Sequence, residues 1–389
     1  MAVSAYTVLS GGTISKRVRW AGGSILVLLY FLWLPSPTEA FYWFISGLAY
    51  TVPCILGLAL LAVMGVLPLI RQHSLRGVFW VIASLLAFFA PAFSEVTACI
   101  AIAGGLVSVP VLWKNRSAAG WWWLTGLALL SAILLLSAPG NFSRIDSMKV
   151  QVSVPHAVFT TTVAVAYMLV NWLGSGILVL VTILLLPWLH QVAVAKAAPI
   201  WQRLTRNVWW WPLFFGMGLY SSFLLTYLAI DTPPPPRCFN ILYLFFMVSW
   251  WMSVFGWIGY RVRKGHAAPQ LSGPARLLVG GLIFVALWSN HDVPLERLHI
   301  NRRINTVVSA YSDWLSGNAA RYDQEQQARY RLLTAPIPDV VLPPLTVKLK
   351  TIYFNDLSSN PHWWGNVDFA ACFGKRSLRV AVPAAVLAR

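Results

Sequence analysis

The sequence predicts an all-α polytopic membrane protein, and three observations support this class. Of its 389 residues, 58% are hydrophobic and only 11% are charged, whereas an ordinary soluble domain has roughly 25% charged residues. Apolar runs of about the length that crosses a bilayer recur along the chain. Basic residues form short clusters between these runs. We therefore expect about nine transmembrane helices and a small extracytoplasmic C-terminal domain.

Each expected span is an apolar run that can satisfy its backbone hydrogen bonds within one helix. The runs are 21–34, 50–70, 77–93, 96–113, 121–138, 166–188, 208–230, 238–260 and 277–288. The first and last are short, because a full crossing takes about 20 residues. The sequence thus divides into a cytoplasmic N-terminus (1–20), a transmembrane helical domain (21–288) and an extracytoplasmic C-terminal domain (289–389).

The basic clusters also predict orientation, because cytoplasmic loops are enriched in Lys and Arg. Alternate predicted loops carry such clusters: Lys16, Arg17 and Arg19; Arg71 and Arg76; Lys114 and Arg116; Lys196, Arg203 and Arg206; Arg261, Arg263 and Lys264. The opposite short loops hold only Arg144, Lys149 and Arg237. The N-terminus is therefore predicted inside and the C-terminal domain outside.

The net charge of +17 does not indicate a nucleic-acid partner, because the basic residues do not form one continuous stripe. No metal-ligating residues are predicted either, since Cys54, Cys99, Cys238 and Cys372 lack paired metal-ligand spacing. Metal dependence itself is left open. Walker, zinc-protease and Gly-x-Ser-x-Gly signatures are absent from the sequence.

Three charged residues in the predicted outer loops are candidates for a functional site. Glu95 lies in a tight hairpin between apolar spans, where a carboxylate is costly to hold and marks function by default. Arg144 follows a Pro-Gly-Asn turn, and Arg237 follows four prolines that favour a stiff extended loop. Arginine is suited to phosphate because its planar fork donates two parallel hydrogen bonds. The alternative for each is a solvated residue, a surface ion pair or a rigid connector.

The first outer loop contains Phe41, Tyr42 and Trp43 with Gly47 and Pro53, and has too little charge for a solvated loop. An interfacial or re-entrant segment is expected there. In the C-terminal domain, His362 beside Trp363 and Trp364 is a candidate for binding sugar, although a lone His is more often structural.

The ordered set of these outer motifs resembles a family of multispanning bacterial membrane proteins of unknown function that are similar to GT-C type glucosyltransferases. The resemblance covers roughly residues 40 to 375. It rests on motifs that are weak singly: Phe41-Tyr42-Trp43 with Gly47, Tyr50 and Pro53; Glu95; Pro139-Gly140-Asn141 with Arg144; Pro236-Arg237; and Asp356 with Asn360-Pro361-His362-Trp363 and Asn366. The chain departs from GT-C enzymes in its first outer loop, where a single Glu39 replaces the usual acidic pair.

The resemblance implies a glycosyltransferase in the bacterial inner membrane that takes sugar from polyprenyl phosphate, a membrane lipid, and passes it to a glycan or glycoconjugate acceptor. It implies that Glu95 and Glu39 are the catalytic carboxylates. It also implies that substrate is bound by Asn141, Arg144, Arg237, Tyr42, Trp43, His362 and Trp363. The cofactor is left unknown.

Two other functions remain open from the sequence. An O-antigen-type polymerase also needs arginines on the outer face. A transporter or flippase of lipid-linked sugar predicts polar residues at mid-span and broken helices. The expected spans are nearly free of charge, with Asn171 among their few polar interruptions, which favours a site at the membrane surface. Surface polysaccharide synthesis is therefore the leading expectation.

Overall fold

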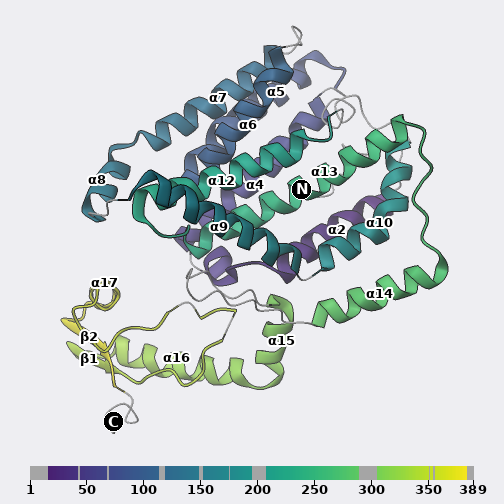
Figure 1. Ribbon diagram of the computed structural model, residues 1–389. Helices are drawn as coiled ribbons and strands as arrows, with labels where there is room; N and C mark the ends of the chain where they lie inside the picture. The colour runs from purple at the N-terminus through teal and green to yellow at the C-terminus, as the bar shows by residue number, and fades with distance from the viewer. Residues whose placement is uncertain are drawn as a thin grey trace. The chain divides into compact units, whose positions relative to one another are not determined.

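The computed structural model describes the chain except for residues 1–15, 43, 68–69, 114–118, 149–151, 175, 195–206, 289–304, 350, 354 and 383–389. The chain forms two compact units, residues 1–305 and 306–389. The first unit is a bundle of helices, and the second combines helices with two short strands (Figure 1).

The described elements of the first unit are all helical. They are α2 (Lys16–Leu32), η1 (Thr38–Tyr42), α3 (Phe44–Ser46), η2 (Gly47–Thr51), α4 (Val52–Val66), α5 (His73–Phe89), η4 (Ala90–Phe93), α6 (Glu95–Trp113), α7 (Ala119–Leu136), α8 (Pro139–Met148), α9 (Val154–Gly174), α10 (Ile177–Val194), α12 (Trp210–Ile230), α13 (Pro236–Arg263) and α14 (Gly273–Trp288).

Six stretches of helix in the described part of the chain are long and apolar enough to cross a membrane. They are Phe44–Val66, His73–Phe93, Ala119–Leu136, Val154–Gly174, Trp210–Ile230 and Pro236–Arg263. Shorter apolar helices occur at Gly23–Leu32, Glu95–Val109, Ile177–Gln191 and Gly273–Trp288. The chain is therefore an all-α membrane protein.

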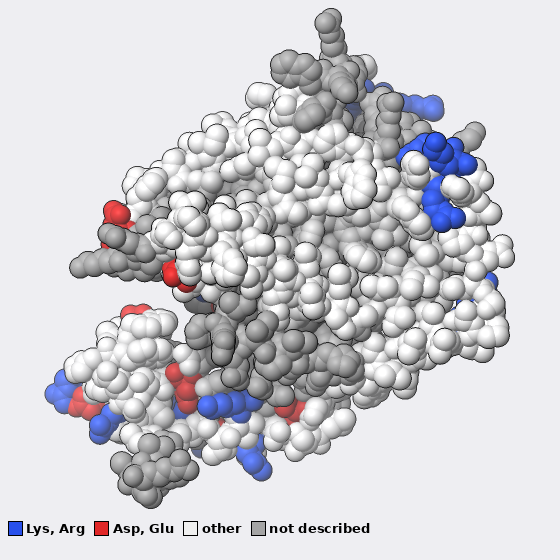
Figure 2. Space-filling view, in the orientation of Figure 1, with Lys and Arg blue, Asp and Glu red and all other residues white. Residues whose placement is uncertain are grey.

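The outward faces of these helices are apolar. Leu277 is 81% exposed and Leu278 is 65% exposed on α14, and α5 and α7 expose further large apolar side chains. The visible face of the bundle is mostly free of charged side chains over a broad area (Figure 2). Such a large exposed apolar surface suits contact with lipid rather than water.

Helix α13 is the centre of the bundle. In its most apolar window 56% of residues are buried, against 17% in the spans formed by α4, α5 and α7. Its aromatic residues pack against those of neighbouring helices, as in the stacked rings of Phe246 and Trp172, 5.1 Å apart. Offset aromatic pairs add about 1 kcal/mol beyond the area they bury, so α13 organises the packing of its neighbours.

The predicted span 166–188 is not one helix, because the chain breaks between α9 and α10. Gly176 has a φ of +66°, a conformation that glycine adopts without the steric cost of a side chain. The expectation of a single helix was wrong because the sequence stays hydrophobic on both sides of the break, and hydropathy does not register a local backbone turn.

Helices α9 and α10 together traverse the bundle once, alongside α13. His156 at the start of α9 contacts Asp231, just before α13. Further along, Thr182 accepts a hydrogen bond from Trp250, and His190 near the end of α10 bonds the main-chain oxygen of His266, just after α13. The contacts thus advance along α13 in the same order as along α9 and α10.

The bundle has two ends that differ in charge. We call the end at the start of α13 the acidic end; it includes Glu39, Glu95 and Asp231. The basic end lies where α13 finishes, and it carries Arg261, Arg263 and Lys264. Two other basic clusters of the sequence, at 114–116 and 196–206, lie outside the described residues.

The second unit contains α15 (Thr306–Leu315), α16 (Asn318–Thr334), β1 (Asp339–Leu342), α17 (Trp364–Cys372) and β2 (Ser377–Val380). Strands β1 and β2 pair in parallel, with Val340 opposite Leu378. Parallel neighbours need a long crossover connection, which here includes α17. The alternating buried residues of both strands pack with Leu333 of α16 and Ala370 of α17 to form a small core.

Candidate functional site

The best-supported candidate site surrounds Arg237, in the first turn of α13. Pro236 precedes it at the first helical position, where a missing N–H costs nothing. Arg237 Nε donates to the Tyr50 hydroxyl at 3.2 Å, and Arg237 Nη1 forms an ion pair with Glu39 Oε1 at 3.5 Å. The guanidinium also lies 5.6 Å from the centre of the Tyr50 ring. Its side chain remains 30% exposed, so it is open to a ligand.

This part of the site attracts anions. The N-terminus of a helix carries partial positive charge, which favours an anion and disfavours a cation such as Arg237. Pro235, which precedes the helix, makes no side-chain cap, and the Cys238 N–H bonds the Pro235 carbonyl at 2.8 Å. Arg237 and the helix terminus together therefore hold more positive charge than Glu39 alone offsets.

Glu39 is almost fully buried, with 1% of its surface exposed. Ser36 Oγ donates to Glu39 Oε2 at 3.0 Å, whereas Glu39 Oε1 has no hydrogen-bond partner among the described residues. Burial raises the pKa of Glu39, although the Ser36 hydroxyl and the Arg237 cation oppose that shift. The carboxyl is thus held against Arg237 by packing and is poorly placed to contact an external substrate.

Asn240, one turn along α13, fixes the segment that presents Glu39. Its side-chain Nδ2 donates to Ser36 O at 2.8 Å, and its Oδ1 accepts from Ser36 N at 2.9 Å. Sequence reasoning missed both residues. The signal for Asn240 was present as a lone amide inside the apolar run 238–260, where a polar side chain needs a partner.

Two π-helical turns shape the loop that carries Glu39 and Tyr50. Glu39 lies in η1 and Tyr50 in η2, and Thr51 Oγ1 donates to Ala40 O at 3.0 Å to join the two turns. π-Helical turns are rare and frequent at functional sites. Where an interfacial or re-entrant segment was expected, helix runs from Phe44 into α4 as one candidate span.

Glu95 is the first residue of α6, where the helix dipole favours a carboxylate. Ser94 precedes it and accepts from Thr97 N at 3.3 Å, which caps the helix. Glu95 is close enough to Tyr50 and Cys238 for its charge to act on both. Unlike Glu39 it is partly exposed. The structure thus brings Glu95 into the neighbourhood of the Arg237 site.

An elongated apolar cavity of about 360 Å³ lies between α4, α6, α7, α12 and α13. Cys54 of α4 and Ile241 of α13 line it, four residues beyond Tyr50 of η2 and Arg237 respectively, and η2 continues directly into α4. Because residues four apart share a helix face, the cavity begins beside the Arg237 site.

Several predicted residues lie elsewhere. Asn141 Nδ2 donates to Leu135 O at 2.8 Å, which satisfies a carbonyl at the end of α7. Arg144 is on α8, but its side chain is outside the described residues, as are the Tyr42 side chain and all of Trp43. A shared cavity for Glu95, Arg144 and Arg237 therefore stays a prediction.

His362 and Trp363 belong to the second unit, at a turn before α17. His362 is exposed and its main-chain N–H bonds the Asn360 side chain at 3.0 Å. Trp363 packs against Trp364, with ring centres 5.0 Å apart. These residues form an aromatic surface, which leaves their predicted contact with sugar open.

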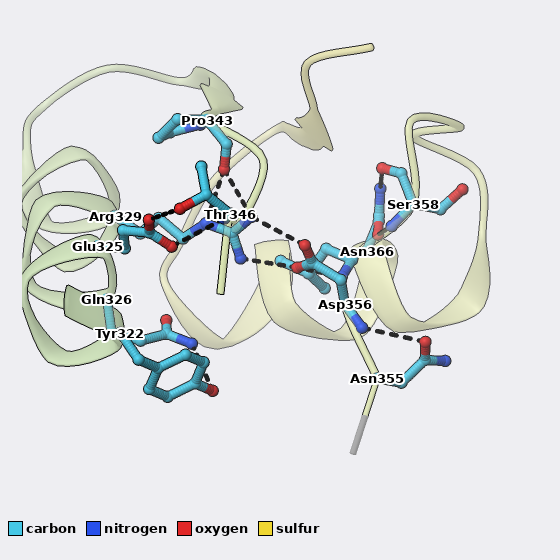
Figure 3. Close-up of polar contacts among 11 residues, drawn as sticks. Tyr322, Glu325, Gln326, Arg329, Pro343, Thr346, Asn355, Asp356, Ser358 and Asn366 are labelled. Carbon is cyan, nitrogen blue, oxygen red and sulfur yellow. Dashed lines mark hydrogen bonds and ion pairs between the residues drawn. The ribbon is translucent and has the colours of Figure 1, made fainter. Parts of the chain in front are cut away.

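Two other residues of the C-terminal motif have structural roles (Figure 3). Asp356 accepts two hydrogen bonds from the buried Arg329, at 2.7 and 3.0 Å. Asn366 is fully buried and donates to the carbonyls of Ser358, Asn360 and Leu378. Both residues hold the irregular segment between β1 and β2 in place.

The described residues contain no group of three or more His, Cys, Asp and Glu side chains that would hold a metal ion. Cys54, Cys99, Cys238 and Cys372 are free thiols.

No family model, curated protein or solved structure matches this chain. The class of the protein is therefore defined only by its fold and its composition. The chain is a polytopic α-helical membrane protein with a partly buried ion pair, Arg237 and Glu39, at one end of its bundle.

Proposed function

We propose that this protein is a membrane glycosyltransferase that uses a lipid-linked sugar phosphate at the acidic end of its bundle. The observation that carries the proposal is the arrangement of Arg237 between Glu39 and Tyr50, beside the partly exposed Glu95 and next to an apolar cavity. Lipid phosphate needs a fixed cation at bilayer-surface depth, and the acceptor hydroxyl needs a carboxylate.

The roles of the two carboxylates follow from their burial. Glu39 is buried against Arg237, so it holds the guanidinium in place rather than meeting the acceptor. Glu95 takes the proton of the acceptor hydroxyl as the new glycosidic C–O bond forms. The bond from the sugar to the carrier phosphate breaks, and the phosphate leaves with the electron pair, bound by Arg237 and Tyr50.

The proposal includes the cellular setting. The basic end faces the cytoplasm because positive clusters are retained there, and the acidic end lies on the outer face of the bacterial inner membrane. The C-terminal unit is extracytoplasmic. The carrier is a polyprenyl phosphate, and the acceptor is a surface polysaccharide or related glycoconjugate.

The first test compares the surface glycans of the wild type and a deletion strain by banding pattern and sugar content. Glu95→Gln keeps the shape of the side chain but removes the base, so it should reproduce the deletion while the protein remains in the membrane. Asp146→Asn, an exposed carboxylate on α8, is the matched control and should leave the glycans unchanged. Identical glycans in the wild-type and deletion strains would refute the proposal.

One observation favours a second candidate, a flippase of lipid-linked sugar. The chain breaks between α9 and α10 at Gly176, partway along the bundle, and transporters use such broken helices to bind substrate. Accumulation of sugar-linked carrier on the inner leaflet of the deletion strain would support this function. Accumulation on the outer leaflet would support the transferase.

A further inference from the structure

The apolar cavity beside the Arg237 site is long and narrow. It is lined from Pro53 to Met64 along α4 and from Thr97 to Ser108 along α6. At 1.5 Å per residue, each stretch spans about 16 Å. Its volume of about 360 Å³ lies near the lower end of the range for ligand pockets, roughly 300 to 1,000 Å³. The shape suits one extended chain rather than a compact molecule.

The lining of the cavity is apolar, and no Asp, Glu, Lys or Arg is among the described residues that form it. Small residues keep it open. A Cβ atom added to Gly57 of α4 would meet nothing within 4 Å, so this side of the cavity is empty space. By contrast, Gly104 and Gly105 of α6 lie close against Phe214 and Leu129. The α6 side of the cavity is therefore closely packed, and the free space lies on the α4 side, beside Gly57.

Charge is found at one end of the cavity. Tyr50 and Arg237 each lie one turn before the lining residues Cys54 and Ile241, and Glu95 lies just before Thr97. An apolar chain already dissolved in a bilayer gains little by moving between lipid and an apolar pocket. Recognition must then come from the fit of the chain together with the contact of a head group with Arg237.

We propose that this cavity binds one linear hydrocarbon chain of an anionic lipid whose phosphate is bound at Arg237 and Tyr50. The proposal deepens the proposed function and rests on it for the identity of the lipid. The chemistry allows two sources, the isoprenoid chain of a polyprenyl phosphate and the acyl chain of an anionic phospholipid.

The test fills the cavity and measures lipid binding to the purified full chain in detergent. Gly57→Phe places a ring in the empty space beside α4, and replacing a helix-interior glycine also favours the helix. Gly126→Phe on α7 is the matched control, because a Cβ there also meets nothing within 4 Å but the residue does not line the cavity. Gly57→Ala leaves most of the space open. The probes are undecaprenyl phosphate and palmitoyl-oleoyl phosphatidylglycerol, titrated separately with native mass spectrometry.

We expect Gly57→Phe to weaken undecaprenyl phosphate binding at least tenfold, with Gly57→Ala and Gly126→Phe close to the wild type. If Gly57→Phe also lost phosphatidylglycerol binding, the cavity would still be a site for a hydrocarbon chain. That result would show, however, that the cavity does not select the polyprenyl carrier of the proposed function. Equal affinities for both probes in Gly57→Phe and Gly126→Phe would overturn the chain site. That result would leave the transferase to be decided by the glycan comparison.

Discussion

The side chain of Asn240 bonds both main-chain groups of Ser36, a residue 204 positions earlier in the chain. The Asn240 amide thus forms the same pair of hydrogen bonds that a main-chain peptide group forms with a neighbouring strand in a β-sheet. It fixes the turn that presents Glu39 to Arg237, because Ser36 also bonds the Glu39 carboxylate. Asn240 is 2% exposed, so the two bonds are sheltered from water.

Asn240→Leu should destabilise the protein by about 1 to 3 kcal/mol, because the Ser36 N–H would lose its acceptor, while the Ser36 carbonyl keeps its bond from the Ala40 N–H. Thermal unfolding in detergent measures the loss. The control is Asn207→Leu, whose amide is exposed and bonds only the nearby Trp209 N–H among the contacts of the described structure. An unchanged unfolding temperature in Asn240→Leu would contradict the role given to this pair.

Arg237→Lys should weaken binding of the anionic substrate roughly ten- to a hundredfold, because a charge-assisted hydrogen bond contributes about 1.5 to 3 kcal/mol. Lysine keeps the charge but loses the planar fork that reaches Glu39 and Tyr50 together. Arg261→Lys is the matched control at the basic end, where the guanidinium lies over Trp257. Equal binding by the two variants, measured by titration with undecaprenyl phosphate, would mean that Arg237 acts only as a positive anchor.

Glu39 should give the protein a pH-dependent stability that Glu39→Gln lacks. Burial raises the pKa of its carboxyl above the ordinary value of 4.5. Between pH 4.5 and the raised pKa, the folded chain keeps a proton on Glu39 that the unfolded chain has lost, so rising pH favours unfolding. The stability of the wild type relative to Glu39→Gln should therefore fall as pH rises from 4.5 to the raised pKa and stay level above it. Unfolding temperatures of both proteins, measured across roughly pH 4 to 8, would reveal this fall. If the difference between the two unfolding temperatures did not change with pH, the pKa of Glu39 would not be shifted by folding.

Asp356→Asn should destabilise the C-terminal unit by about 3 kcal/mol, because it leaves the Arg329 cation buried without its partner. Burial alone would raise the pKa of Asp356, yet the bonds from Arg329 lower it below 3.8. The stability it contributes is therefore present above that value and lost as pH falls through the lowered pKa. Hydrogen exchange in β1 and β2 reports on this unit specifically.

Asp339→Asn is the matched control for that measurement. Asp339 also pairs with an arginine, Arg376, but both side chains are exposed, at 42% and 75%. Exposed ion pairs contribute little to stability because water screens them. Hydrogen exchange in β1 and β2 should therefore be nearly the same in Asp339→Asn as in the wild type. Equal effects of the two substitutions would mean that burial does not distinguish the pairs.

Hydropathy predicted most of the helices, because a bilayer requires long apolar runs whatever their tertiary contacts. The break at Gly176 was missed, since its cause is a local backbone conformation within a run that remains apolar on both sides. The boundary before α15 also differs from the sequence estimate: the second unit begins at Thr306, whereas hydropathy could mark only the end of the last apolar run at Trp288.

The candidate site was predictable in part. Glu95 was singled out because charge beside an apolar span is costly. Arg237 was singled out because it follows four prolines and because its planar fork suits phosphate. The partnership of Arg237 with Glu39 and Tyr50 was not predictable, because it depends on how α13 packs against a turn far away in the sequence. Asp356 and Asn366 were noticed as parts of a motif, but only the fold assigns them to hold a loop.

The contrast between the two ends of the bundle makes the described part of the bundle an electrical dipole along α13. Moving one elementary charge across a membrane potential of 100 mV changes the free energy by about 2.3 kcal/mol. Arg261, Arg263 and Lys264 lie at one end, and Glu39, Glu95 and Asp231 at the other. In a cell whose interior is negative, the potential itself therefore favours insertion with the basic end inward, and a de-energised membrane should yield more inverted molecules.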